Sequence, residues 1–124
     1  MHEAGEHVHV AVFPEVHEMH QFTSRQFAFE RRCFVLAVGL LMRVGDLLDP
    51  LKADSLKDKS DALILRGGTS IIAPNGSYIV EHGFDDERII IAELDLTMID
   101  REQMTLDVTG HYARPDVFDL RVRS

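Results

Sequence analysis

Residues Cys33 to Leu41 read C-F-V-L-A-V-G-L-L, an apolar run without a charged side chain. A run of this length favours a strand that is buried on both faces, as in the centre of a layered α/β protein. It is far shorter than the ~20 residues that a membrane-spanning helix needs. The stretch therefore predicts the central strand of a sheet that is covered on both sides.

A shorter alternating segment, His7 to Phe13 (H-V-H-V-A-V-F), precedes this run and places three valines on one face. Alternation with a period of two is the pattern of a strand. Pro14 ends the segment, because proline cannot donate a hydrogen bond to a strand ladder. We predict a first strand over these residues.

The chain between the two predicted strands, from about Glu15 to Arg32, contains no glycine or proline, and polar residues separate its apolar ones. This pattern predicts a helix that leads directly into the central strand. The residues expected near its apolar face are Met19, Phe22, Phe29 and Cys33.

Turn residues predict further strands downstream. Pro74-Asn75-Gly76 suits the turn of a hairpin between Thr69 to Ala73 and Ser77 to Glu81. Arg88 to Leu94 (R-I-I-I-A-E-L) predicts another buried strand.

The remaining segments are a polar excursion over Asp46 to Asp61, a short helix over Asp95 to Met104 with Thr97 as a candidate N-cap, and an alternating end over Val117 to Arg123. The order of strand, helix and several strands indicates one mixed α/β domain over residues 1–124.

The charge balance restricts the partners. Thirteen Lys and Arg stand against 21 Asp and Glu, which gives a formal net charge of −8. Phosphate backbones and anionic membrane surfaces attract basic residues, so we expect neither nucleic acid nor membrane as the partner. The polar, acidic start of the chain, Met1 to Glu6, is unlike a signal peptide, and a cytoplasmic location is expected.

Five segments carry a more specific pattern. They are Val8 to Pro14 (V-H-V-A-V-F-P), Ser24 to Ala37 (S-R-Q-F-A-F-E-R-R-C-F-V-L-A), Gly67 to Ser77 (G-G-T-S-I-I-A-P-N-G-S), Ile89 to Leu96 (I-I-I-A-E-L-D-L) and Gly110 to Phe118 (G-H-Y-A-R-P-D-V-F). In this order they resemble the nitrilase family of carbon–nitrogen hydrolases. The resemblance implies the C-terminal portion of an αββα sandwich, with a mixed sheet and a flanking helix.

The resemblance also implies a reaction, the conversion of a nitrile to a carboxylic acid and ammonia. In the family a Cys thiolate attacks the nitrile carbon, a Glu acts as general base and a Lys stabilises charge in the transition state. These residues precede the strand that corresponds to Val8 to Pro14. We therefore expect a partial domain that lacks the N-terminal catalytic part and is inactive alone, and we assign no catalytic residue.

Cys33 is the only cysteine, and it corresponds to a structural position of the family. Burial in an apolar run makes a thiol inert, so we interpret Cys33 as a core residue. Glu30 is either a buried carboxylate paired with Arg25, Arg31 or Arg32, or an exposed or salt-bridged helix residue.

The resemblance carries over four substrate-pocket candidates, Phe13, Pro14, Glu15 and Val16, which match a pocket-lining loop of the family. The other interpretation is simply a strand end followed by a helix start. In the family the tail crosses to a neighbouring subunit, so Tyr112 and Phe118 are interface candidates. A nitrile or an amide is expected as a ligand only in the intact enzyme.

Five of the seven histidines lie within the first twenty residues. The spacing of His17 and His20 in H-E-M-H differs from the H-E-x-x-H pattern that places two zinc ligands on one helical face. We predict no metal and no cofactor. The rival hypothesis is a non-catalytic module that oligomerises or binds a metal or partner. A partial sandwich exposes apolar strands, so a homodimer or higher oligomer is expected.

Overall fold

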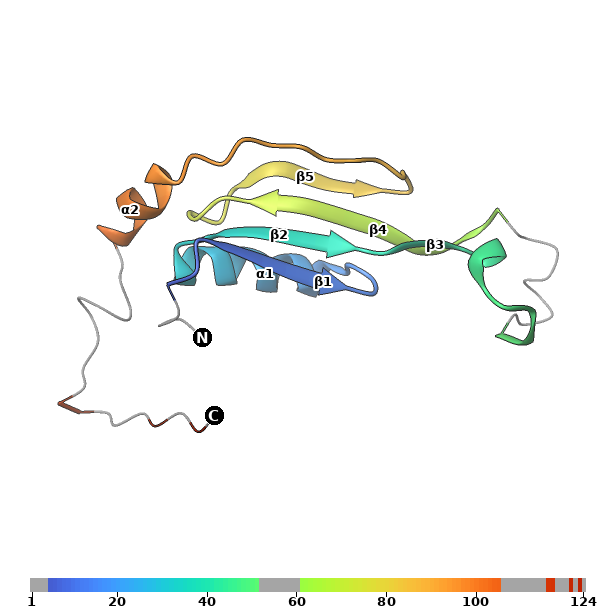
Figure 1. Cartoon of the computed structure of the whole chain (residues 1–124), viewed down its shortest axis with the longest axis horizontal. Helices are drawn as coiled ribbons and strands as arrows, with labels where there is room; N and C mark the ends of the chain where they lie inside the picture. The colour runs from blue at the N-terminus through green and yellow to red at the C-terminus, as the bar shows by residue number, and fades with distance from the viewer. Residues whose placement is uncertain (1–4, 52–60, 106–115, 118–120, 122, 124) are drawn as a thin grey trace.

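The computed structural model describes residues 5–51, 61–105, 116, 117, 121 and 123. Five strands form one sheet (Figure 1). They are β1 (Val8–Phe13), β2 (Phe34–Gly39), β3 (Leu41–Arg43), β4 (Leu63–Ile72) and β5 (Tyr78–Phe84). β2 and β3 pair with successive parts of β4, β5 pairs with β4 as well, and β1 lies outside β2. The order confirms the mixed α/β class.

β1 and β2 run parallel and are joined by the helix α1 (Glu18–Arg31), which makes a βαβ unit. Their register pairs Val8 with Phe34 and Phe13 with Gly39, so both strands end at the same edge of the sheet. All other strand pairs in the described part of the chain are antiparallel. The predicted first strand, helix and central strand are thus confirmed in order, but the central strand ends at Gly39, and Leu41, the last residue of the predicted strand, begins β3.

The helix begins three residues later than predicted. His17 is its N-cap, and the His17 backbone N–H donates to Nδ1 of His20 at 3.0 Å. The helix ends at Arg31 because Arg32 adopts the left-handed conformation (φ 57°), and the Arg32 N–H donates to the Ala28 carbonyl at 2.8 Å. This is a common way to close a helix.

The helix faces the sheet with a different stripe from the predicted one. Its buried residues are Ser24, Ala28 and Arg31, at spacings of four and three. Of the predicted face, Met19 is 68%, Phe22 54% and Phe29 43% exposed, whereas Cys33, which follows the helix, is buried as predicted. The prediction was wrong because two stripes have helical spacing, and the small side chains of Ser24 and Ala28 let the helix approach the sheet closely.

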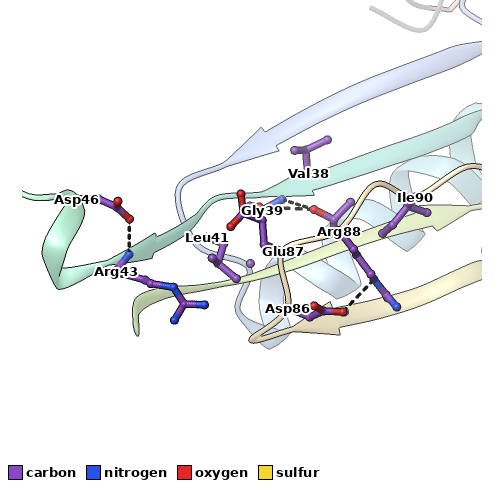
Figure 2. A pocket seen from close by; sticks show the side chains of 12 residues that line it. Val38, Gly39, Leu41, Arg43, Asp46, Asp86, Glu87, Arg88 and Ile90 are labelled. Atoms are coloured by element: carbon purple, nitrogen blue, oxygen red, sulfur yellow. Dashed lines mark hydrogen bonds and ion pairs between the residues drawn. The ribbon is translucent and has the colours of Figure 1, made fainter. Parts of the chain in front are cut away.

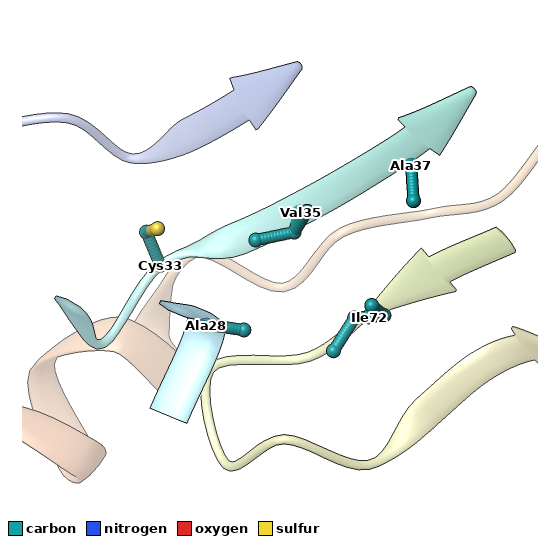
Figure 3. Close-up of a cluster of buried hydrophobic side chains, with 5 residues drawn as sticks. All are labelled: Ala28, Cys33, Val35, Ala37 and Ile72. Atoms are coloured by element: carbon teal, nitrogen blue, oxygen red, sulfur yellow. The ribbon is translucent and has the colours of Figure 1, made fainter. Parts of the chain in front are cut away.

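The core has one cluster on each face of the sheet. Between α1 and the sheet, Ala28 of α1 forms a cluster with Cys33, Val35, Ala37 and Ile72 (Figure 3). On the other face, Phe34 and Ala73 pack with Ile99 of the short helix α2 (Thr97–Gln103). Phe34 and Val35 are both 0% exposed, so the start of the central strand is buried on both faces as predicted. The prediction was wrong for the end of the run, where Val38 is 37% and Leu40 46% exposed.

The predicted hairpin is confirmed. The Ala73 N–H donates to the Ser77 carbonyl at 2.8 Å, and Gly76 has a φ of +83°, which glycine adopts without strain. Both strands are longer than the sequence indicated, since β4 begins at Leu63 and β5 ends at Phe84.

The predicted strand over Arg88 to Leu94 is wrong. This stretch is extended after β5 but joins no ladder among the described strands, and Ile89 and Ile91 are 90% and 88% exposed. An apolar run indicates side chains suited to burial, but it does not say whether a pairing edge is within reach.

The short helix is confirmed, but Thr97 is its first residue and not its cap. Asp95 Oδ1 accepts from the Thr97 N–H at 3.0 Å and from Thr97 Oγ1 at 2.7 Å. The polar excursion begins with two short 3-10 turns, Val44–Asp46 and Asp49–Leu51, and its residues 52–60 lie outside the description. Most of Val117 to Arg123 lies outside it too.

No helix in the described part of the chain is long and apolar enough to cross a membrane.

Candidate functional site

The carboxyl ends of β1 and β2 meet where the predicted pocket residues lie. Ligands of α/β proteins commonly bind outside the carboxyl ends of parallel strands. Phe13 ends β1 opposite Gly39 and is half-buried, with its ring 4.8 Å from that of His20. Pro14 is exposed and Glu15 half-buried.

Val16 is buried at 5% exposure, and it lies against Gly39 at the end of β2 and Gly68 within β4. A Cβ on Gly39 would lie 2.8 Å from Val16 Cγ2, and one on Gly68 would lie 2.9 Å from Val16 Cβ. A Cβ on Gly39 would also overlap the carbonyl of Gly67. Glycine is required here because two backbones and one valine share the space.

A cavity of about 440 Å³ lies beside Gly39 and Gly67 (Figure 2). Its floor includes Gly39 and Thr69, whose side-chain Oγ1 accepts from the Gly39 N–H at 3.1 Å. Its rim carries charges of both signs, among them Arg88, whose Nε lies 4.0 Å from Asp86 Oδ2. Among the described residues that line the cavity, Thr69 is the one with a hydroxyl group, and this hydroxyl is hydrogen-bonded to the backbone of Gly39.

The four predicted pocket residues do not line this cavity. Phe13 lines a smaller cleft of about 250 Å³ between β1 and α1. Their role in substrate binding stays a prediction. The interface candidates Tyr112 and Phe118 lie outside the described residues.

Cys33 is fully buried beneath α1 (Figure 3). Burial, followed by the negative charge of Glu6, raises the pKa of the Cys33 thiol to about 11, and the nearby Arg31 opposes this only in part. The interpretation of Cys33 as a core residue is confirmed. A thiol in this state offers neither access nor thiolate for nucleophilic attack.

The histidines of the first twenty residues that the structure describes form local contacts. His9 Nδ1 lies 2.9 Å from Glu6 Oε1, and His17 Nε2 lies 3.3 Å from Glu15 Oε2. Across the described ranges no three His, Cys, Asp or Glu side chains gather in a way that could hold a metal ion.

Two buried arginines were missed by the sequence reasoning, which weighed Glu30 as the buried charge. Glu30 is half-buried, whereas Arg31 and Arg32 are 6% and 5% exposed. Arg32 Nη1 donates to Glu102 Oε2 of α2 at 2.9 Å, and its guanidinium lies 4.4 Å from the Phe29 ring centre. Among the described residues, Nε and Nη2 of Arg31 and Nε of Arg32 have no hydrogen-bond partner.

Comparison with known proteins places the chain in a family. The family model for carbon–nitrogen hydrolase matches residues 1–102. An aliphatic nitrilase of Sinorhizobium fredii (strain HH103) is 40% identical over 100 residues, which cover 81% of this chain and 32% of that protein. An arylacetonitrilase of Trametes versicolor is 35% identical over 120 residues, 96% of this chain and 38% of that protein.

A bifunctional nitrilase/nitrile hydratase of Nicotiana tabacum is 32% identical over 126 residues, 99% of this chain and 36% of that protein. The crystal structure of a carbon–nitrogen hydrolase from Helicobacter pylori G27 superposes with a TM-score of 0.68 at 16% identity, covering 95% of this chain and 41% of that one. The predicted nitrilase-type fold is confirmed by this likeness.

The chain belongs to the carbon–nitrogen hydrolase family. It spans about a third of the length of the curated relatives that it matches.

Proposed function

We propose that this chain is one part of a nitrilase-type domain that converts a nitrile to a carboxylic acid and ammonia, acting in the cytoplasm. The observation that carries the proposal is the extent of the similarity. The nitrilases match 81% to 99% of this chain, whereas this chain matches about a third of each. A part of this size holds a share of the fold and, by our proposal, only a share of the site.

We propose further that the 124 residues alone turn over neither nitriles nor amides. The chemistry needs a thiolate with a base beside it and a positive group where charge develops. With a pKa of about 11, only about one Cys33 thiol in ten thousand would be ionised at neutral pH. Burial of Cys33 removes access as well.

The contribution of this chain to the intact site would be the wall at the ends of β1 and β2. Val16 is held in place by the Gly39 and Gly68 backbones, so the loop that begins at Pro14 has a fixed path. By our proposal Phe13, Pro14, Glu15 and Val16 form one side of the nitrile pocket once the remainder of the domain is present.

Ammonia release from aliphatic nitriles, arylacetonitriles and the corresponding amides tests the proposal. We expect the purified chain to release none above the level of its Cys33→Ala variant. Release that requires Cys33 would contradict the proposal, because it would make a buried core thiol the nucleophile.

A second candidate function, a self-associating module, is favoured by the exposed apolar side chains of the sheet. Val10 and Val12 are 55% and 73% exposed on β1, and Val38 is 37% exposed on β2. Exposed apolar patches often mark interaction sites. A homodimer or higher oligomer that covers this face is compatible with the first proposal. Sedimentation velocity tests it.

A further inference from the structure

β1 is an edge strand within the described sheet, because it pairs with β2 alone. Parallel strands are usually interior, with packing on both faces. Here the outer edge of β1 offers its backbone N–H and C=O groups without a strand partner among the described residues, and Val12 on it is 73% exposed. The βαβ unit therefore has the geometry of a sheet interior at a position where the described sheet stops.

A cleft runs between β1 and α1 on the helix side of this edge. It has a volume of about 250 Å³, and most of its lining is apolar, including Phe13, Phe27 and Val35. Ser24 also lines it and is 3% exposed, yet its Oγ has no hydrogen-bond partner in the described part of the chain. A buried hydroxyl without a partner is a costly arrangement, and it indicates a group that is missing.

Arg31 is a second buried polar residue with atoms that lack a hydrogen-bond partner among the described residues, and it is charged. It lies seven residues after Ser24 on the same buried face of α1, about 10 Å further along the axis. Its Nε and Nη2 are buried without a hydrogen-bond partner among the described residues. The favourable interaction of a cation with the helix C-terminus is smaller than the cost of burying it unpaired.

We infer that the cleft between α1 and β1, together with the free edge of β1, forms a seam that binds the rest of a carbon–nitrogen hydrolase domain. We infer also that this second polypeptide supplies a carboxylate to Arg31. It would add a strand to the free edge of β1, place apolar side chains in the cleft, and accept a hydrogen bond from Ser24. The inference rests on the proposed function, since relatives about three times as long identify the occupant.

The isolated chain tests the state of Arg31. We expect Arg31→Met to raise the urea midpoint of unfolding, because an apolar side chain replaces a buried cation whose Nε and Nη2 have no hydrogen-bond partner among the described residues. Arg32→Met is the matched control: it leaves Glu102 without its cation and should lower the midpoint. A midpoint lowered as much by Arg31→Met as by Arg32→Met would overturn the inference, because Arg31 would then already have an anionic partner in this chain.

Co-expression tests the partner. The tagged full chain is expressed with the part of the Sinorhizobium fredii aliphatic nitrilase that it does not match, and complex formation is measured after purification. We expect a stable complex, weakened at least about tenfold by Arg31→Met and little changed by Arg32→Met. No complex with the unsubstituted chain, or equal binding by Arg31→Met, overturns the inference.

Nitrile hydrolysis by the same complex separates the two claims. A complex that depends on Arg31 but releases no ammonia would contradict the proposed function and leave the seam as an interface. A homodimer of the isolated chain that Arg31→Met dissociates would overturn the choice of occupant, because a second copy would then supply the carboxylate.

Discussion

At the scale of single residues, the structure buries three ionisable side chains among the residues it describes, and the sequence predicted the burial of only one of them. Cys33 stands in an apolar run, and the run predicted its burial correctly. Arg31 and Arg32 stand at the end of a polar helix, where nothing in the spacing distinguishes a buried arginine from an exposed one. Their burial follows from the way the helix end meets the start of β1, which is a tertiary feature.

The raised pKa of Cys33 predicts a loss of stability at high pH. The thiol is neutral when protonated, and its pKa rises from 9.0 to about 11 in the folded chain. The unfolded chain therefore releases this proton first, and stability falls as the pH rises from 9 to 11, by up to roughly 2 kcal/mol. Below pH 9 the contribution is constant.

Urea unfolding across this range measures the effect. Burial also raises the pKa of Tyr78, so Tyr78→Phe is the background in which Cys33 and Cys33→Ala are compared. We expect the fall in stability to be smaller in the alanine variant. Parallel curves would show that Cys33 does not titrate differently in the folded state.

At the scale of elements, α2 covers the face of the sheet opposite α1 through one buried side chain. Ile99 is 3% exposed and packs with Phe34 and Ala73, while Arg32 and Glu102 tie the helix to the end of α1. Ile99→Ala should lower the free energy of unfolding by about 2 to 4 kcal/mol, since it removes packed atoms and leaves a cavity.

Met104→Ala is the matched control, because Met104 follows the same helix and is 87% exposed. It should change the unfolding free energy by less than about 0.5 kcal/mol. Equal effects in chemical denaturation would mean that α2 does not pack on the sheet.

The elements whose patterns have one solution were predictable. The alternation over His7 to Phe13, the apolar run over Cys33 to Leu41 and the Pro74-Asn75-Gly76 turn each predicted an element that the structure contains, although the strand in the apolar run ends at Gly39. The buried face of α1 was not predictable from spacing, since two stripes compete. The extended stretch after β5 was wrongly expected in the sheet, because composition reports apolar side chains and not the presence of a neighbour.

The candidate site was likewise predictable only in part. The resemblance indicated the Phe13 to Val16 loop, and the apolar run indicated that Cys33 is a core residue. In the structure Val16 lies against the backbones of Gly39 and Gly68. The buried Ser24 Oγ and the buried Nε and Nη2 of Arg31, which have no hydrogen-bond partner in the described part of the chain, became apparent only from the packing of α1. Satisfaction of hydrogen bonds depends on every neighbour, so one sequence does not indicate where it fails.

At the scale of the whole molecule, the uncovered face of β1 and β2 predicts self-association of the isolated chain. Apolar area is worth ~25 cal/mol per Å² when buried, so covering this face is favourable. We expect sedimentation velocity to show species larger than a monomer, and Val12→Asp to shift them to the monomer, since a charge at the interface resists burial.

Leu48→Asp is the control for this experiment. Leu48 is 71% exposed, close to the exposure of Val12, but lies outside the sheet between the two 3-10 turns. It should leave the sedimentation profile unchanged. A monodisperse monomer of the unsubstituted chain would contradict the predicted oligomer.

The family assignment makes Cys33, the single cysteine of the 124 residues, the decisive residue for a test of activity. A nitrilase-type reaction passes through a covalent bond between a cysteine sulfur and the nitrile carbon, so a competent nucleophile would be labelled by a nitrile-derived electrophile. Intact mass spectrometry of the purified chain after incubation with such a probe measures this directly. Unchanged mass is the result expected if Cys33 is held in the core, whereas an adduct on Cys33 would contradict the account.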